Sequence, residues 1–200
     1  MRNFKVLFLI LFLSACALQQ PNSSAELETK PVASLSEKFI GNELNNSLQW
    51  LGIPYAQPPE GSLRWKAPRA LQKNDKKIKA TDFGSPCPQL ASFSIDRIEG
   101  GEYIGSEDCL YLNVFTPKNL NPDKKLPVMF WIHGGGNTSG EAGSYDFSKL
   151  AAAHDLVIVS INYRLGFLGW FYHPSFAATS NSLEDKSGNF GTLDQIMALK

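Results

Sequence analysis

The sequence predicts an α/β fold, because it contains three strand-like segments and a helical segment between the last two. Residues 109–115 are rich in β-formers and end before Pro117. Residues 127–132 and 156–161 are apolar on both faces, which is typical of buried strands. Residues 145–154 place apolar side chains at helical spacing. A strand, a loop, a helix and a strand in this order predict a parallel pair of strands in one sheet.

The composition argues against several classes of protein. The chain has 200 residues, enough for one domain with a sizeable core, and is 43% hydrophobic and 19% charged. Nineteen Lys and Arg residues balance nineteen Asp and Glu residues, so no bulk charge favours binding to nucleic acid. The three His and three Cys residues are widely scattered and lack metal-ligand spacing, which argues against a zinc site.

The first fifteen residues have the pattern of an export signal. Two basic residues precede a short apolar run at 6–13, which is too short to span a membrane as a helix. Residues 13–16, Leu-Ser-Ala-Cys, resemble the bacterial lipobox, in which a lipid is attached to the Cys. We therefore expect a signal peptide at 1–15, lipidation of Cys16, and an exported protein anchored by its lipid to a bacterial membrane. An ordinary signal peptide cut nearby, with Cys16 incidental, is the alternative.

The remainder divides into a tether and a domain. Residues 16–38 lack apolar periodicity and are predicted to be a flexible tether, followed by a domain at 39–200. Residues 50–56 form a strand-like apolar run that a turn cluster at 58–61 closes. Residues 74–79 are predicted to be a charged surface loop.

A helix is expected to begin near Thr192. Gln195 follows Thr192 at the spacing of a capping box, and apolar residues come next. No stop signal for this helix precedes the last residue, so we expect Lys200 to be a truncation point.

Cys87 and Cys109 remain once Cys16 is assigned to the lipid. An export signal implies an oxidising compartment, in which two remaining cysteines usually pair. Such a bond would close a loop of about twenty residues and contribute about 3 kcal/mol of stability. Two separate buried thiols are the alternative.

The segment His133-Gly134-Gly135-Gly136 directly follows the strand-like segment that ends at Ile132. Consecutive glycines let backbone N–H groups turn toward a common point, because no Cβ obstructs them. This geometry suits an oxyanion in acyl transfer, where one donor typically lowers the barrier by about 2.7–4 kcal/mol. A plain glycine-rich turn is one alternative. A phosphate-binding loop is another, although the Gly-Lys-Ser/Thr of a Walker loop is absent.

Four blocks of sequence, in order, resemble the type-B carboxylesterase and cholinesterase family. They are LGIPYAQPPEGSLRWKAP at 51–68, EDCLYLNVFTP at 107–117, SINYRLGFLG at 160–169 and GNFGTLDQIMAL at 188–199. The resemblance covers about residues 40–200. It implies the N-terminal part of an α/β-hydrolase fold, with a mostly parallel central sheet and an antiparallel N-terminal strand region. It also implies hydrolysis of small-molecule carboxylic esters by a Ser–Glu–His triad, without a metal or organic cofactor.

The resemblance also assigns roles to individual residues. Gly135 and Gly136 would supply two oxyanion N–H donors, and Asn137 departs from the aromatic residue often found next, which leaves the shape of the acyl pocket open. Cys87 and Cys109 match the first disulfide of the family. Structural ion pairs are implied between Arg64 and Glu107 and between Arg164 and Asp194; a bidentate Arg–carboxylate pair can lock two loops together.

The catalytic triad is missing from these 200 residues. No Ser stands in the G-x-S-x-G pattern of a nucleophile elbow, and the nearest match, at 136–140, has the wrong spacing. The order of the family places the elbow, the acid and the base beyond residue 200. His133, His154 and His173 all precede that point, so none is predicted to be the catalytic base. We expect the 200-residue chain alone to be inactive.

Three interpretations of the chain remain open. It is part of an esterase whose remaining sequence lies elsewhere, a non-catalytic binding protein on the same fold, or an inactive gene product that does not fold stably. The retained glycine motif favours the first. A nucleophile elbow in the coding sequence after residue 200 would distinguish the first from the second.

Overall fold

The computed structural model describes residues 39–72, 77–91, 101–121 and 123–200. The predicted signal peptide, Cys16 and the tether lie outside the described residues, as do residues 74–76 of the loop predicted at 74–79. Residues 78–79 of that predicted loop belong to a short strand instead.

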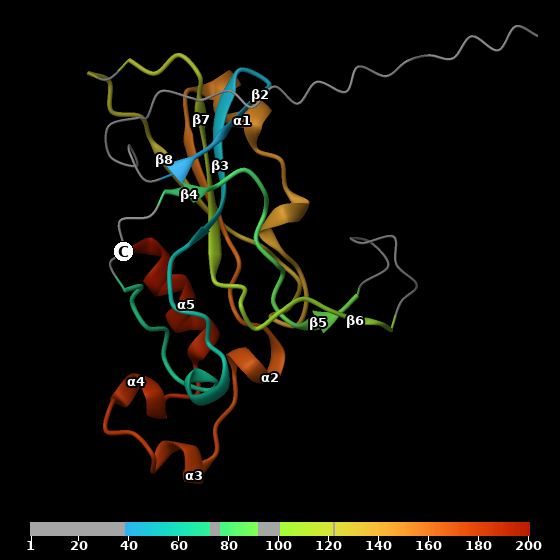
Figure 1. Ribbon diagram of the computed structural model, residues 1–200, viewed down its shortest axis with the longest axis vertical. Helices are drawn as coiled ribbons and strands as arrows, with labels where there is room; N and C mark the ends of the chain where they lie inside the picture. Colours follow the sequence, from blue (N-terminus) through green and yellow to red (C-terminus); the bar gives the residue numbers. More distant parts are fainter. Residues whose placement is uncertain (1–38, 73–76, 92–100, 122) are drawn as a thin grey trace, which may run out of the picture.

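A five-stranded sheet in the order β2-β3-β7-β9-β8 runs through the centre of the molecule (Figure 1). Its strands are β2 (Asn42–Leu44), β3 (Ser47–Pro54), β7 (Tyr111–Pro117), β8 (Val128–Ile132) and β9 (Val157–Ile161). β8 and β9 are parallel, and the other neighbouring strands are antiparallel. The predicted parallel pair and the antiparallel N-terminal region are therefore confirmed.

Short strands and helices surround this sheet. β1 (Phe39–Ile40) pairs with β4 (Ile78–Lys79), and β5 (Gln89–Leu90) pairs with β6 (Tyr103–Ile104). The α-helices are α1 (Ser148–His154), α2 (Gly166–Gly169), α3 (Pro174–Ala177), α4 (Leu183–Lys186) and α5 (Phe190–Leu199), and two 3₁₀ turns are η1 (Gly61–Leu63) and η2 (Ala142–Ser144). In Figure 1, α1 lies beside the upper half of the sheet, and α2 to α5 gather at its lower end.

Side chains alternate between the two faces of the sheet along its central strands. Each face is covered by a cluster of buried side chains. Phe115 of β7 packs with Ala151 of α1 on one face, whereas its neighbour Val114 packs with Trp50 and Ala80 on the other. A third cluster lies at the lower end of the sheet and consists of Ala56, Cys87, Cys109, Leu110, Ile161, Tyr163 and Leu165. This third cluster carries the candidate site.

The structure corrects the prediction for β8. Its apolar sequence predicts a fully buried strand, but β8 lies at the edge of the five-stranded sheet and pairs only with β9 among the described residues. The side chain of Val128 is consequently 65% exposed and that of Ile132 42%.

The predicted helix boundaries also need correction. The helix predicted at 145–154 begins at Ser148, after the 3₁₀ turn η2, and ends at His154 because Asp155 is left-handed. α5 begins at Phe190 rather than near Thr192, and no side chain caps it. The predicted capping box is therefore wrong: Thr192 lies inside the helix, and its hydroxyl accepts a hydrogen bond from Trp170 Nε1 at 3.3 Å.

No helix in the part of the chain that the structure describes is long and apolar enough to cross a membrane.

Candidate active site

The glycine segment forms a loop, residues 133–141, that leaves the end of β8 and leads into η2; we call it the glycine loop. Its backbone is left-handed at Gly135, Gly136 and Asn137, with φ values of 111°, 61° and 62°. A Cβ at Gly135 would overlap the carbonyl oxygen of Ser139. Asn tolerates the left-handed region better than most residues, since its short polar side chain can hydrogen-bond locally. The sequence therefore suits this turned backbone.

The turn uses the carbonyl group of Gly135, and the amides of Gly135 and Gly136 are among those that it leaves unpaired in the described residues. Gly135 O accepts hydrogen bonds from the N–H groups of Thr138 and Ser139, at 3.1 and 3.2 Å. The N–H groups of Gly135 and Gly136 donate no hydrogen bond to any described residue, and both glycines are exposed. They can therefore donate to a ligand.

His133 holds the start of the glycine loop. Its buried ring stacks on Tyr163 with the centroids 4.4 Å apart, and its Nδ1–H donates to Gly134 O at 2.9 Å. The Tyr163 hydroxyl in turn donates to His133 O at 2.7 Å. Burial lowers the pKa of His133, against the effect of the Gly134 hydrogen bond, so the neutral ring is favoured. His133 Nε2 has no hydrogen-bond partner among the described residues.

Two side-chain amides hold the other end of the glycine loop. The Gln89 amide accepts from Gly140 N–H at 2.7 Å and donates to Gly140 O at 3.0 Å. Asn162, which directly follows β9, accepts from Ala142 N–H at 2.7 Å through its Oδ1. The middle of the loop is fixed as well, because Asn137 O accepts from Gly166 N–H at 2.7 Å.

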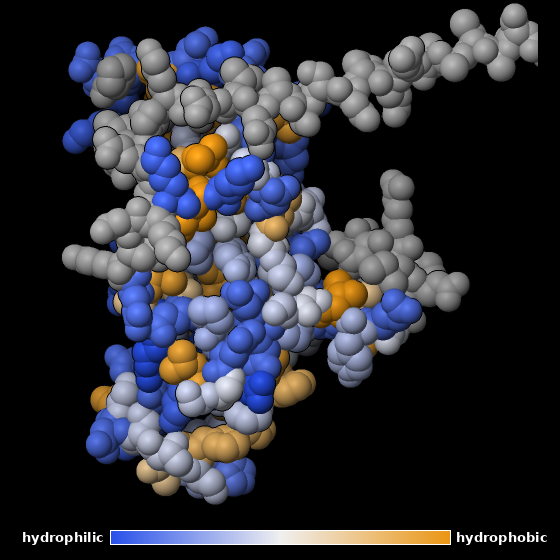
Figure 2. Space-filling model, viewed as in Figure 1, coloured by the Kyte–Doolittle hydropathy of each residue, from blue (hydrophilic) through white to orange (hydrophobic). Residues whose placement is uncertain are grey.

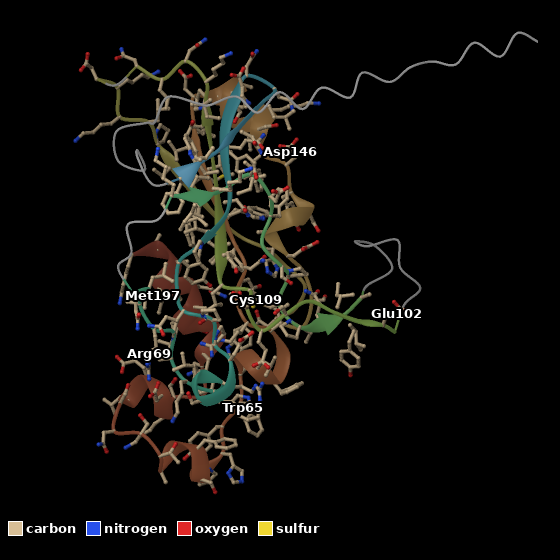
Figure 3. The ribbon with its side chains drawn as sticks, viewed as in Figure 1. Trp65, Arg69, Glu102, Cys109, Asp146 and Met197 are labelled. Carbon is tan, nitrogen blue, oxygen red and sulfur yellow. A yellow bond between two sulfur atoms is a disulfide. The ribbon has the colours of Figure 1, made fainter. Side chains whose placement is uncertain are left out.

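The remaining predicted site residues support the loops around the glycine loop. Cys87 and Cys109 form a disulfide with their Cα atoms 5.0 Å apart, and Figure 3 shows Cys109 at the lower end of the sheet, where β7 begins. Arg64 pairs with Glu107 through two hydrogen bonds, one of them from Nε to Oε2 at 2.6 Å.

Arg164 and Asp194 form a buried, bidentate ion pair that joins the segment after β9 to α5. The Asp194 carboxylate accepts from Arg164 Nε at 2.8 Å, from Nη2 at 2.7 Å and from the backbone N–H of Arg164 at 3.1 Å. Burial raises the pKa of Asp194, and the hydrogen bonds from Arg164 oppose that shift. Arg164 Nη1 also donates to Lys66 O at 2.8 Å, so this side chain links three segments.

The other two histidines lie on different elements from the glycine loop. His154 is the last residue of α1 and is exposed. His173 caps α3 and accepts a hydrogen bond from Ser175 N–H at 3.2 Å. In the described ranges, no three His, Cys, Asp or Glu side chains group closely enough to hold a metal ion.

Sequence reasoning missed three residues that fix the glycine loop: Gln89, Asn162 and Tyr163. Asn162 and Tyr163 directly follow a strand of the central sheet, which is a common position for functional polar groups. Gln89 carries no local signal, because its partner Gly140 is 51 residues away in the sequence.

The fold and the glycine loop together indicate the structural class of this protein. A mixed α/β sheet with an exposed pair of glycine amides after one of its strands is the arrangement of the N-terminal part of an α/β-hydrolase. The family model "Carboxylesterase family" matches residues 36–200, and this chain belongs to that family.

Similar proteins support this assignment. The chain is 46% identical over 169 residues to the para-nitrobenzyl esterase of Bacillus subtilis, covering 82% of this chain and 32% of that protein. It is 37% identical over 198 residues to carboxylesterase 1D of Rattus norvegicus, covering 94% of this chain and 34% of the relative. A solved PNB esterase structure superimposes with a TM-score of 0.67 and 41% identity, over 80% of this chain and 32% of that one. The chain thus spans about one third of the length of the relatives that it matches.

Proposed function

We propose that this chain supplies the oxyanion-binding part of a carboxylic ester hydrolase. Gly135 and Gly136 are the donors, and the nucleophilic Ser, the acid and the base come from sequence beyond residue 200. The observation that carries this proposal is the pair of glycine amides, which are exposed and unpaired among the described residues directly after β8. Because neither glycine has a Cβ, a ligand oxygen can approach these two donors closely.

The chemistry follows from where negative charge develops. When a Ser oxygen attacks the ester carbonyl, the C=O π electrons move onto the carbonyl oxygen, which becomes an oxyanion. Two backbone N–H groups already aimed at that oxygen stabilise the charge without reorganising during the reaction. Collapse of the intermediate expels the alcohol and leaves an acyl-enzyme. Water then repeats the attack and releases the carboxylic acid, so one ester and one water yield one alcohol and one acid.

We propose small-molecule carboxylic esters as the substrate class. The relatives support this class through their names, which include para-nitrobenzyl esterase and carboxylesterase. A backbone oxyanion hole contacts only the carbonyl oxygen common to all esters, so it sets the reaction type rather than the identity of the ester.

The test joins residues 39–200 of this chain to the part of the Bacillus subtilis esterase that follows its matched segment. We expect the fused protein to hydrolyse a chromogenic short-chain ester and the 200-residue chain alone to show no turnover. Gly136→Ala keeps the N–H but adds a Cβ at a left-handed position beside the oxyanion, so it should displace this donor and lower kcat by up to about 10²- to 10³-fold, the effect of losing one oxyanion donor. Gly61→Ala is the matched control, because Gly61 is also left-handed, with φ 55° against 61°, and a Cβ would have open space at both positions.

A fused protein that folds but lacks turnover would contradict the ester hydrolase and favour a non-catalytic binding protein. So would a fused protein in which Gly136→Ala and Gly61→Ala have the same small effect.

We also propose that the protein is exported and held on a bacterial membrane by a lipid on Cys16. The support is the sequence pattern at 1–16, and two or more acyl chains suffice for stable anchoring because each buried CH₂ contributes about 0.8 kcal/mol. Cys16→Ser should release the protein from the membrane fraction. Membrane association that is unchanged in this variant would contradict the lipid anchor.

A further inference from the structure

We propose that Gln89 is a positioning residue for the oxyanion donors and that the Cys87–Cys109 disulfide acts on the glycine loop through it. The inference rests on the proposed function only for its catalytic consequence. The structural part, that Gln89 fixes the conformation of the glycine loop, stands on contacts within the described residues.

The glycine loop is held mainly at its two ends. Residues 134–138 are exposed, and three consecutive positions are left-handed, so little packing surrounds the middle of the loop. The hydrogen bond from Gly166 N–H to Asn137 O holds the middle at one point, and the contacts at the two ends supply the rest. His133 is buried at one end and Gly140 at the other.

Gln89 pairs with Gly140 through its side-chain amide. One side-chain amide satisfies both backbone groups of Gly140, as a neighbouring strand would, and its Nε2 also donates to Cys87 O at 3.0 Å. Gln89 is only 7% exposed, so water cannot replace these bonds without opening the structure.

Gly140 lies against the residues that precede the two donors. A Cβ at Gly140 would lie 2.5 Å from both Gly134 O and His133 Nδ1, so the two ends of the loop are in close contact. By holding Gly140 against this pair, Gln89 closes the loop on the residue that precedes the first donor. A shift of Gly140 would therefore be transmitted to Gly135 and Gly136.

Gln89 is itself tied to the central sheet. It lies two residues after Cys87, at the start of β5, and Cys87 is bonded to Cys109, two residues before β7 begins. Both cysteines are buried in the cluster at the lower end of the sheet. The disulfide therefore ties the backbone that carries Gln89 to the sheet from which the glycine loop also extends.

The first experiment measures amide hydrogen exchange in the 200-residue chain with Gln89→Met, which keeps the length of the side chain and removes its hydrogen bonds. The informative amides are Ser139 N–H, bonded to Gly135 O, and Gly166 N–H, bonded to Asn137 O, because Gln89 touches neither pair. We expect both to exchange at least about tenfold faster, while amides of β7 and β9 are unchanged. Unchanged exchange at Ser139 and Gly166 would overturn the proposal.

Gln49→Met is the matched control. Gln49 is 4% exposed, lies in β3, and its Nε2 has no hydrogen-bond partner among the described residues. We expect no change in the glycine loop. Equal loosening of the loop by Gln49→Met would show a general effect of losing a buried Gln and would also overturn the proposal.

Reduction of the disulfide tests the second half of the inference. In the parent chain, reduction should accelerate exchange at Ser139 and Gly166. In the Gln89→Met chain it should add little, because the connection is already broken. Additive effects of reduction and substitution would mean that the disulfide does not act through Gln89.

The second experiment is kinetic and uses the fused esterase described above. Gln89→Met should lower kcat about 10- to 100-fold and leave KM within about twofold, because displaced donors affect the transition state more than the bound ester. A loss confined to KM would contradict a positioning role. If the parent fused protein is inactive, the proposed function fails, and the exchange experiment still decides whether Gln89 holds the loop.

Gln89→Glu is a second variant, and its defect should depend on pH. It tests whether Gln89 positions the donors even if Gln89→Met does not fold. An ionised carboxylate cannot donate to the carbonyl oxygens of Gly140 and Cys87, whereas a protonated one keeps an acceptor for Gly140 N–H and has one O–H donor, which restores one of the two hydrogen bonds that the amide NH₂ donates. The kcat of this variant, relative to the parent at each pH, should therefore rise as the pH falls. A constant ratio would overturn the proposal.

Discussion

Arg164 and Asp194 show how strongly single residues stabilise this fold. Their side chains are 3% and 0% exposed, and the carboxylate accepts three hydrogen bonds from Arg164. A buried pair of this kind costs desolvation when it forms, but removal of one partner leaves a charge that nothing compensates.

We predict that Arg164→Met lowers the free energy of unfolding by about 3–5 kcal/mol, because Asp194 is left buried and unpaired. Urea denaturation of the parent and the variant measures the difference. Lys124→Met is the control: Lys124 and Asp155 form an ion pair in which both side chains are more than half exposed, and its loss should cost at most about 1 kcal/mol. Equal losses in the two variants would contradict the argument from burial.

His133 makes the stability depend on pH. Burial lowers the pKa of His133 in the folded chain, and Nε2 faces surroundings in which no described residue pairs with it. In the unfolded chain the pKa is about 6.5. As the pH falls below about 6.5, the unfolded chain takes up this proton before the folded chain does. The stability that the neutral ring of His133 contributes is therefore fully present above about pH 6.5. It is lost as the pH falls through the pKa of His133 in the folded chain.

We predict that the free energy of unfolding decreases between pH 7.5 and 5.5 and that His133→Phe makes this decrease smaller. Phe keeps a ring to stack on Tyr163 and cannot titrate, so the slope contributed by this position disappears. Urea denaturation at several pH values gives the slope, which for one group is at most about 1.4 kcal/mol per pH unit. A slope unchanged by His133→Phe would contradict this role of burial.

At the scale of elements, the disulfide connects two parts of the cluster at the lower end of the sheet. Cys87 and Cys109 are 22 residues apart in sequence, and the bond limits the freedom of the unfolded chain between them. The same segment carries β5 and β6, whose two-residue strands have too few hydrogen bonds to fix it alone.

We predict that replacing both Cys87 and Cys109 by Ala lowers the free energy of unfolding by about 3 kcal/mol, the loop-closure value for this separation. Denaturation with and without a thiol reductant measures the effect. The reductant should destabilise the parent and leave the double variant unchanged. A parent whose midpoint does not respond to reductant would contradict a stabilising disulfide.

The edge strand β8 illustrates how an element differs from its sequence pattern. Its five residues contain no charge and no proline, the features that usually protect an edge from pairing with another chain. Within the described residues its outer edge has no partner, and the glycine loop begins at its end.

The surface of the whole molecule carries several exposed hydrophobic side chains. Val128 of β8 and Leu199 of α5 are 65% and 69% exposed, and Figure 2 shows separate hydrophobic patches among the polar surface, including one near β5 and β6. Exposed apolar patches and an open strand edge favour association between chains.

We predict that the 200-residue chain self-associates and that the fused esterase is monomeric at the same concentration. The reason is that the additional sequence would cover the edge of β8 and the exposed side of α5. Size-exclusion chromatography with light scattering measures the state of both proteins. Val128→Lys, which places a charge on the open edge, should reduce association of the 200-residue chain. A chain that is monomeric at high micromolar concentration would contradict the prediction.

The sequence alone determined the fold class, the β8–α1–β9 unit and the family, because alternating or continuous apolar runs and ordered motifs are local properties of the chain. It also located the glycine loop directly after β8, since a run of glycines permits a turned backbone. Only the tertiary structure decided that β8 is an edge strand, that α5 begins at Phe190, and that Gln89 holds Gly140. Each of these depends on which distant segment lies alongside. Pairing across 51 residues leaves no periodicity in a sequence, because a hydrogen bond requires proximity in space and not along the chain.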